Sequence, residues 1–195
     1  MTTREISRAA EVLARGGTVV YPTETVYGIG ASVFIPRAVE RVFEIKGRPR
    51  GMPLSVAVAS FEMMGEIARI DDGDLPLLRR VLPGPVTFLV ERGPKLPDLV
   101  TAGSELVGIR FPDHPAALEL IALSGPITST SANLSGLPPP ASLAELDGEI
   151  RKNVDLVLDG GRSRYGLPST LIYGAERRCP GRGQVWRGWT GAKLS

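Results

Sequence analysis

The sequence predicts a single α/β domain in which helices flank a mixed β-sheet. Its 195 residues suit one globular domain, and an apolar content of 43% is enough for a substantial core. Segments with helical spacing of apolar residues alternate with short β-branched runs, which is typical of a layered α/β sheet. Prolines border several of these runs and favour a mixed sheet over a purely parallel one. No linker or internal repeat interrupts the pattern.

The first elements follow from local spacing and chain-breaking residues. Apolar residues between positions 6 and 13 recur at helical spacing, and Gly16-Gly17 supplies the left-handed stop that commonly ends a helix. Residues 18–21 predict a strand. This strand runs into Pro22, which has no amide hydrogen for a β-ladder, so residues 22–28 should leave the sheet as a loop.

A second helix and a buried strand come next. Pro36 opens the helix and Gly47 ends it, so residues 46–51 form a basic loop at the helix end. The mostly apolar run at residues 54–58 lacks strict alternation and predicts a strand buried on both faces. Ser60 can cap a short helix after this strand.

Helix and strand segments keep alternating in the second half. Residues 75–82 predict a helix, and Asp113 can cap another. Ser142 and Glu145 have capping-box spacing for one more helix. Further strands are expected at residues 86–90, 107–110, 127–130, 154–158 and 170–173.

The composition excludes several classes of protein. A formal net charge of +2 does not by itself indicate a nucleic-acid scaffold. Cys179 and His114 are the only residues of their types, which rules out an intrachain disulfide and a Cys/His zinc cluster. The N-terminus is charged where a signal peptide is apolar, and the uncharged stretch 120–144 is broken by glycines and prolines. We therefore expect a cytoplasmic protein without a membrane span.

Familiar catalytic signatures are missing. There is no GxxxxGK[ST] loop, no GxSxG elbow, and Gly28-Ile29-Gly30 lacks the third glycine of a dinucleotide fingerprint. Polar segments instead stand where strands or helices are expected to end, at residues 22–25, 46–48, 131–133 and 169–170. Such ends commonly converge on one crevice of an α/β sheet.

The basic residues at these ends can be interpreted in two ways. Lys46 and Arg48 suit a polyphosphate, but they also suit a solvated helix end whose cations complement the dipole. Arg110 ends an apolar strand, where a substrate carboxylate or an internal salt bridge could pair with it. Taken alone, residues 22–25 are typical of an ordinary turn and residues 131–133 of a hydroxyl-capped loop.

Six segments, in this order and spacing, resemble the YrdC family of threonylcarbamoyl-adenylate synthases. They are YPTETVYG at residues 21–28, KGRP at 46–49 with Pro53-Leu54, PGPVT at 83–87, VGIRFP at 107–112, TSANLSG at 130–136 and PST at 168–170. The resemblance covers residues 16–173 and is closest to the short form of the family. It implies one YrdC-like domain over residues 1–195, with residues 174–195 as a basic C-terminal segment.

The resemblance also implies a fold, a reaction and its partners. The expected fold is a twisted mixed sheet with a large positively charged cavity. The expected reaction joins L-threonine, bicarbonate or CO2, and ATP into threonylcarbamoyl-AMP and pyrophosphate. A tRNA-modifying threonylcarbamoyl transferase would receive the product. Mg2+ is expected with ATP, mainly on phosphate oxygens and water, and no protein ligand for it can be named.

Motif positions imply the site residues. Threonine contacts fall to Thr25, Arg110, Ser131 and Ser169. Nucleotide contacts fall to Lys46 and Arg48, which are also the expected catalytic pair, to Asn133, and to Arg182 or Arg178 in an ambiguous C-terminal alignment.

The chain departs from the family at two positions, and two other functions stay open. Ala57 stands near the place of a histidine found in many relatives, and Leu106 stands where a hydroxyl residue is common. One alternative is an RNA-binding module without catalysis, with phosphate contacts near Arg48 and in the basic tail. The other is a relative that forms carbamoyl-adenylate from carbamoyl phosphate.

Overall fold

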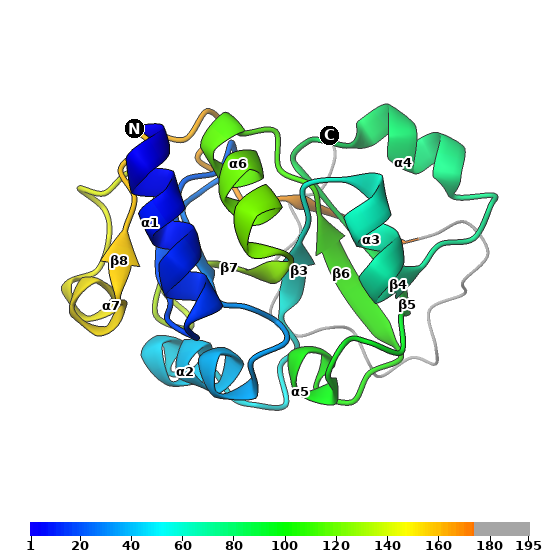
Figure 1. Ribbon diagram of the computed structural model, residues 1–195, viewed down its shortest axis with the longest axis horizontal. Helices are drawn as coiled ribbons and strands as arrows, with labels where there is room; N and C mark the ends of the chain where they lie inside the picture. The colour runs from blue at the N-terminus through cyan, green and yellow to red at the C-terminus, as the bar shows by residue number, and fades with distance from the viewer. Residues whose placement is uncertain (174–195) are drawn as a thin grey trace.

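A computed structural model describes residues 1–173 and shows one mixed sheet with helices on both faces (Figure 1). The strands are β1 (Val19–Tyr21), β2 (Gly28–Gly30), β3 (Ser55–Ala57), β4 (Ala68–Arg69), β5 (Val86–Arg92), β6 (Leu106–Arg110), β7 (Ile127–Ser131), β8 (Leu156–Val157) and β9 (Thr170–Tyr173). The helices are α1 (Thr3–Ala14), α2 (Pro36–Lys46), α3 (Phe61–Ile67), α4 (Leu75–Val81), α5 (Asp98–Thr101), α6 (Pro115–Ser124) and α7 (Gly148–Asn153). Within residues 1–173, no helix is both long and apolar enough to span a bilayer.

The strand pairing is mixed, as predicted. The sheet order is β4-β5-β6-β3-β7-β2-β1-β8, and β9 pairs with β5 off this path. β3 runs parallel to β6 but antiparallel to β7, and β1 runs parallel to β8 but antiparallel to β2. Segments far apart in the sequence, such as β3 and β7, therefore become direct neighbours in the middle of the sheet.

Side chains from alternate strand positions enter two separate cores. In β1, Val19 and Tyr21 pack into the core beneath α1 and α6, which lie side by side in Figure 1. Val20 between them points to the opposite face and packs into the larger core with residues of α2 and β6. Because both faces are covered here, the short strands are buried and carry no polar alternation.

Predicted helix ends are confirmed where the signal is a cap or a glycine. Gly16 follows α1 with a φ of +83°, and Gly47 ends α2 in the left-handed region with a φ of +56°. The hydroxyl of Ser60 accepts a hydrogen bond of 3.1 Å from the backbone nitrogen of Met63, so Ser60 caps α3 as expected.

Two predicted caps are wrong. His114, not Asp113, is the N-cap residue of α6, and its side chain makes no capping hydrogen bond. Pro115 disfavours helical backbone at the residue before it, so the helix starts only at the proline. The His114 side chain is half-buried.

The predicted capping box at Ser142 closes a turn instead of starting a helix. The backbone nitrogen of Glu145 donates to the backbone oxygen of Ser142 at 3.1 Å, not to its hydroxyl. The Glu145 carboxylate accepts from the backbone nitrogen of Ala141 at 2.8 Å. Helix α7 begins later, behind Asp147, whose carboxylate accepts from the Glu149 nitrogen at 2.7 Å. Side-chain bonds to nearby backbone groups stabilise turns and helix starts alike, so spacing alone could not separate them.

Strand β2 was missed by the sequence analysis because two of its three residues are glycines. The glycines allow close packing against larger neighbours. A Cβ atom on Gly28 would lie 3.2 Å from the Tyr21 ring, and one on Gly30 would lie 2.8 Å from Cδ1 of Ile127. β1 and β2 therefore pair tightly, and the loop between them, residues 22–27, is held at one end of the sheet.

Candidate active site

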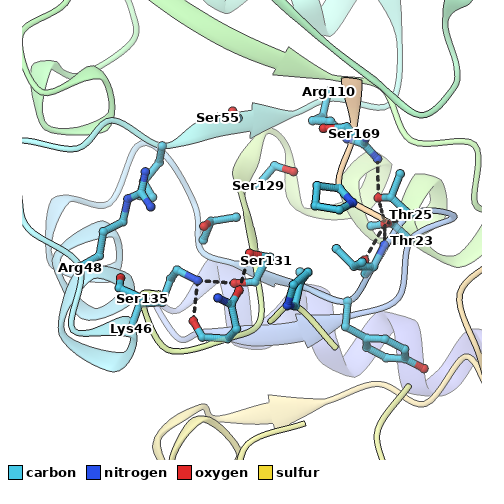
Figure 2. A pocket seen from close by; sticks show the side chains of 18 of the residues that line it. Thr23, Thr25, Lys46, Arg48, Ser55, Arg110, Ser129, Ser131, Ser135 and Ser169 are labelled. Atoms are coloured by element: carbon cyan, nitrogen blue, oxygen red, sulfur yellow. Dashed lines mark hydrogen bonds between the residues drawn. The ribbon is translucent and has the colours of Figure 1, made fainter. Parts of the chain in front are cut away.

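One cavity of about 610 Å³ collects the predicted site segments (Figure 2). Its volume lies in the range usual for small-molecule sites. Within the described residues, every predicted site residue lines it: Thr25, Lys46, Arg48, Arg110, Ser131, Asn133 and Ser169. Figure 2 shows Lys46 and Arg48 on one side and Thr25, Arg110 and Ser169 on the other. Arg178 and Arg182 lie outside the described residues.

The hollow forms where one face of the sheet changes from apolar to small and hydroxyl-bearing residues. Along β7, Ile127 packs beneath α1 and α6, whereas Ser129 and Ser131, two and four residues further on, line the cavity. A period of two keeps all three on one face. Gly108 on β6 lies close by, since a Cβ atom there would be 2.6 Å from the Ser55 hydroxyl oxygen.

Lys46 forms the inner part of the basic end. It is the last residue of α2 and only 2% exposed, so it is not a solvated helix end. Its Nζ atom donates to the backbone oxygen of Ser131 and, at 2.7 Å, to that of Asn133. Burial, together with the charge of nearby Arg48 as the smaller cause, lowers the pKa of Lys46 to about 7. The ammonium group is thus fixed by two carbonyls and poorly solvated.

Arg48 forms the outer part of the basic end. Its Nε atom donates to the backbone oxygen of Met52 at 3.1 Å, and its Nη2 atom donates to that of Pro53 at 2.9 Å. Partial burial lowers the pKa of this guanidinium. The side chain therefore stabilises the loop that follows α2 while it lines the cavity.

The Ser131–Asn133 segment is a hydroxyl-capped loop and part of the cavity wall at the same time. The Ser131 hydroxyl donates to Oδ1 of Asn133. The side-chain nitrogen Nδ2 of Asn133 donates to the backbone oxygens of Leu134 and Leu137, at 2.9 and 2.7 Å. These bonds hold the loop in shape beside Lys46.

Arg110 lies at the opposite end, and the internal salt bridge considered for it is present. Its Nη2 atom donates to Oε1 of Glu24 at 2.8 Å and to the Thr25 hydroxyl at 3.2 Å. Both members of the ion pair are almost fully buried. The Nη1 atom is buried and has no hydrogen-bond partner within the described residues, while the Arg110 side chain as a whole lines the cavity.

Hydroxyl groups surround this end. The hydroxyl oxygens of Thr23 and Thr25 lie 2.8 Å apart, and Thr23 also donates to the backbone oxygen of Val26 at 2.7 Å. Residues 22–25 are thus an internally bonded turn, and Thr23 and Thr25 of this turn line the cavity. The Ser169 hydroxyl lies 2.6 Å from that of Thr87, which is fully buried in β5.

Sequence reasoning missed three residues at the site. Ser55 and Ser129 face each other in the register of β3 and β7 and both line the cavity, and Thr87 holds Ser169 from behind. The available signal was a hydroxyl residue inside an otherwise apolar strand. Ala57, near the place of the family histidine, is fully buried in the core beneath α1 and α6 and does not line the cavity.

The donor groups of the cavity are hydroxyls, amides and cations. No acidic side chain of the described part lines it, and residues 1–173 contain no cluster of three side chains suited to a metal ion. This arrangement can bind anionic and hydroxyl-bearing groups and offers no nucleophile–base pair.

The fold and cavity define an α/β domain that can hold anionic ligands without a P-loop. The chain belongs to the Sua5/YciO/YrdC family, whose model, described as "Telomere recombination", matches residues 11–182. The resemblance drawn from the six motifs, including the mixed α/β fold, is confirmed.

Individual relatives agree with this assignment. The threonylcarbamoyl-AMP synthase of Pyrococcus abyssi (strain GE5 / Orsay) is 40% identical over 170 residues, covering 86% of this chain and 50% of the relative. The threonylcarbamoyl-AMP synthase of Pseudomonas aeruginosa (strain UCBPP-PA14) is 35% identical over 170 residues, covering 85% of this chain and 92% of the relative. The crystal structure of P. abyssi Sua5 complexed with L-threonine has a TM-score of 0.86 and 39% identity over 90% of this chain and 52% of that one. The chain thus spans about half the length of the P. abyssi relative.

Proposed function

We propose that the protein is a threonylcarbamoyl-AMP synthase. It would join L-threonine, bicarbonate or CO2, and ATP, and release pyrophosphate. The observation that carries the proposal is the meeting of seven motif residues in one cavity, although they are spread from Thr25 to Ser169 along the chain. Relatives that bear this enzyme name match most of the chain, and one related structure contains L-threonine.

The two ends of the cavity suit the two large substrates. Lys46 and Arg48 carry the charge that would hold the triphosphate of ATP. The guanidinium of Arg110, which lines this end of the cavity, suits the α-carboxylate of threonine, and the hydroxyls of Thr25 and Ser169 suit its polar groups. This arrangement would place the amino group between the two ends.

The reaction would need alignment and charge stabilisation more than covalent catalysis. The threonine amine attacks the carbon of CO2 and loses a proton, which gives a carbamate. A carbamate oxygen then attacks the α-phosphorus of ATP as the bond to the pyrophosphate leaving group breaks. Fixed cations beside the phosphates stabilise the negative charge that spreads over their oxygens.

Magnesium would enter with ATP. Because the described cavity lining offers hydroxyl and amide oxygens but no carboxylate, the ion would be held by phosphate oxygens and water. When bound, it would neutralise phosphate charge. The product would pass to a threonylcarbamoyl transferase that modifies tRNA, and we expect this transfer to take place in the cytoplasm.

One assay tests the proposal against both alternatives. The protein is incubated with ATP, Mg2+, bicarbonate and one amino acid at a time, and pyrophosphate and the adenylate product are measured. Threonine-dependent release of both supports the synthase. Release with carbamoyl phosphate in place of threonine and bicarbonate would indicate the carbamoyl-adenylate reaction, and RNA binding without any release would indicate a non-enzymatic module.

A further inference from the structure

A buried carboxylate stands behind the cavity wall without lining the cavity. Glu24 is 3% exposed, and its Oε1 atom accepts the 2.8 Å hydrogen bond from Nη2 of Arg110. Of the ion pairs between described residues, this is the only one in which both side chains are buried. Every other pair has at least one strongly exposed partner.

A buried ion pair is a poor way to stabilise a fold. Desolvation of the two charges offsets most of their attraction, and apolar residues of similar volume often serve as well or better. Two polar atoms of this pair, Oε2 of Glu24 and Nη1 of Arg110, also lack hydrogen-bond partners within residues 1–173. A geometric role for the pair is therefore the better explanation.

The pair restricts how the guanidinium is oriented. Nη2 of Arg110 is bonded to both Glu24 and Thr25, and a guanidinium is planar and rigid. With Nη2 held by two acceptors, the orientation of the whole guanidinium at the cavity wall is fixed. Figure 2 shows Arg110 directed toward Thr25 at the end of the cavity away from Lys46.

Glu24 is itself held firmly. Its backbone oxygen accepts a 2.9 Å hydrogen bond from the nitrogen of Tyr165. On either side of it, the hydroxyls of Thr23 and Thr25 lie 2.8 Å apart and close the turn. The carboxylate is thus presented by a fixed loop, as an orienting group requires.

We propose that Glu24 is a positioning residue that holds the Arg110 side chain, which lines the cavity, in the orientation that meets the carboxylate of the amino-acid substrate. This inference rests on the proposed function. Glu24 also neutralises Arg110, which leaves Lys46 and Arg48 as the unpaired cations of the described cavity lining. The phosphates of ATP are thereby directed away from the amino-acid end.

Two variants test the role. Glu24→Gln keeps the shape but removes the charge, and Glu24→Asp keeps the charge but shortens the reach by one methylene. For both, we expect the KM for threonine to rise about tenfold, as loss of one charge-assisted hydrogen bond would cause, while the KM for ATP stays within about twofold. Glu149→Gln, at an exposed ion pair with Lys152, is the matched control and should change neither value.

A second readout separates positioning from general stabilisation. L-threoninamide lacks the carboxylate, so the preference of the protein for threonine over threoninamide reports the Arg110 contact. This preference should fall in both Glu24 variants by the same factor as the threonine KM rises. In an Arg110→Lys background, Glu24→Asp should produce no further change.

A failure of the Glu24 role can be distinguished from a failure of the proposed synthase activity. No threonine-dependent pyrophosphate from the wild-type protein would sink the proposed function. An active wild type whose Glu24 variants keep the threonine preference would overturn the role of Glu24 alone. Loss of threonine and ATP affinity together, or loss of the folded state by circular dichroism in both variants, would assign Glu24 to folding instead.

Discussion

The side-chain nitrogen of Lys46 lies 2.7 Å from the backbone oxygen of Asn133, although 87 positions separate the two residues. This bond joins the end of α2 to the loop that follows β7. The same loop returns a bond to the helix, because the backbone nitrogen of Ser135 donates to the oxygen of Lys46 at 2.9 Å. A basic segment and a hydroxyl segment thereby become one wall of the cavity.

The first prediction concerns the pH dependence of ATP use. Because the pKa of Lys46 is lowered to about 7, the ammonium is charged below this pH and loses its proton above it. If the charged form binds the triphosphate, kcat/KM for ATP should fall by up to about tenfold per pH unit as the pH rises beyond the pKa. Rates measured from about pH 6 to about pH 9 at saturating Mg2+ check this.

Lys46→Arg is the matched variant for that measurement. A guanidinium stays charged across the whole range, so the decline at high pH should disappear even if the overall rate is lower. A decline of equal steepness in Lys46→Arg would show that another group titrates.

The second prediction concerns Arg48. Arg48→Ala should lower threonylcarbamoyl-AMP synthesis by about 100-fold or more, because a preorganised cation beside the reacting phosphates is removed. The circular dichroism spectrum should stay that of the wild type. Arg50→Ala is the control, since Arg50 is exposed and pairs with Glu40 at 3.4 Å. Near-normal turnover by Arg48→Ala would remove Arg48 from the phosphate site.

The third prediction concerns the hydrogen bond between the hydroxyls of Thr87 and Ser169, which holds Ser169 at the cavity wall. Thr87→Val keeps the shape of a fully buried side chain but removes the hydroxyl that lies 2.6 Å from that of Ser169. The KM for threonine should rise about threefold to tenfold, and the free energy of unfolding should fall by about 1 kcal/mol. Thr101→Val, at a fully buried threonine away from the cavity, should leave the KM unchanged. An unchanged KM in Thr87→Val would show that Ser169 needs no such support.

The fourth prediction concerns Gly108, which packs behind Ser55 of the cavity lining. A Cβ atom on Gly108 would lie 2.6 Å from the Ser55 hydroxyl oxygen and 3.0 Å from Cγ2 of Thr87. Gly108→Ala should therefore lower the free energy of unfolding by about 1–3 kcal/mol and weaken substrate binding. Gly65→Ala, where a Cβ atom meets nothing within 4 Å, should be neutral or stabilising in urea denaturation. Equal stability of the two variants would contradict the close contact.

Much of the secondary structure could be predicted because its signals are local. The spacing of buried residues in α1, the left-handed Gly47 after α2 and the Ser60 cap of α3 all act within a few positions of the chain. Strand β2 and the start of α7 could not be predicted. The first depends on pairing with β1, where the Tyr21 ring packs against both glycines, and the second on which of two similar caps the surrounding chain favours.

The site divides in the same way. The order of the motifs pointed to the residues that line the cavity, since those side chains belong to continuous segments such as residues 22–25 and 131–133. Ser55 and Thr87 were not predicted as site residues, because a hydroxyl in a buried strand does not indicate a binding site until the neighbouring strands are known. An internal salt bridge of Arg110 was only one of two alternatives, and its partner Glu24, 86 positions away, was not foreseen.

By itself, the amino-acid sequence determined the α/β class, most helix and strand positions, and the family to which the chain belongs, because all of these depend on patterns that span a few residues at a time. Only the tertiary structure decided that Arg110 is neutralised by Glu24, that Lys46 is buried against two carbonyls, and that seven scattered residues share one cavity. These relationships depend on strand pairing and on the packing of helices against the sheet, and both bring together residues whose distance no local pattern specifies.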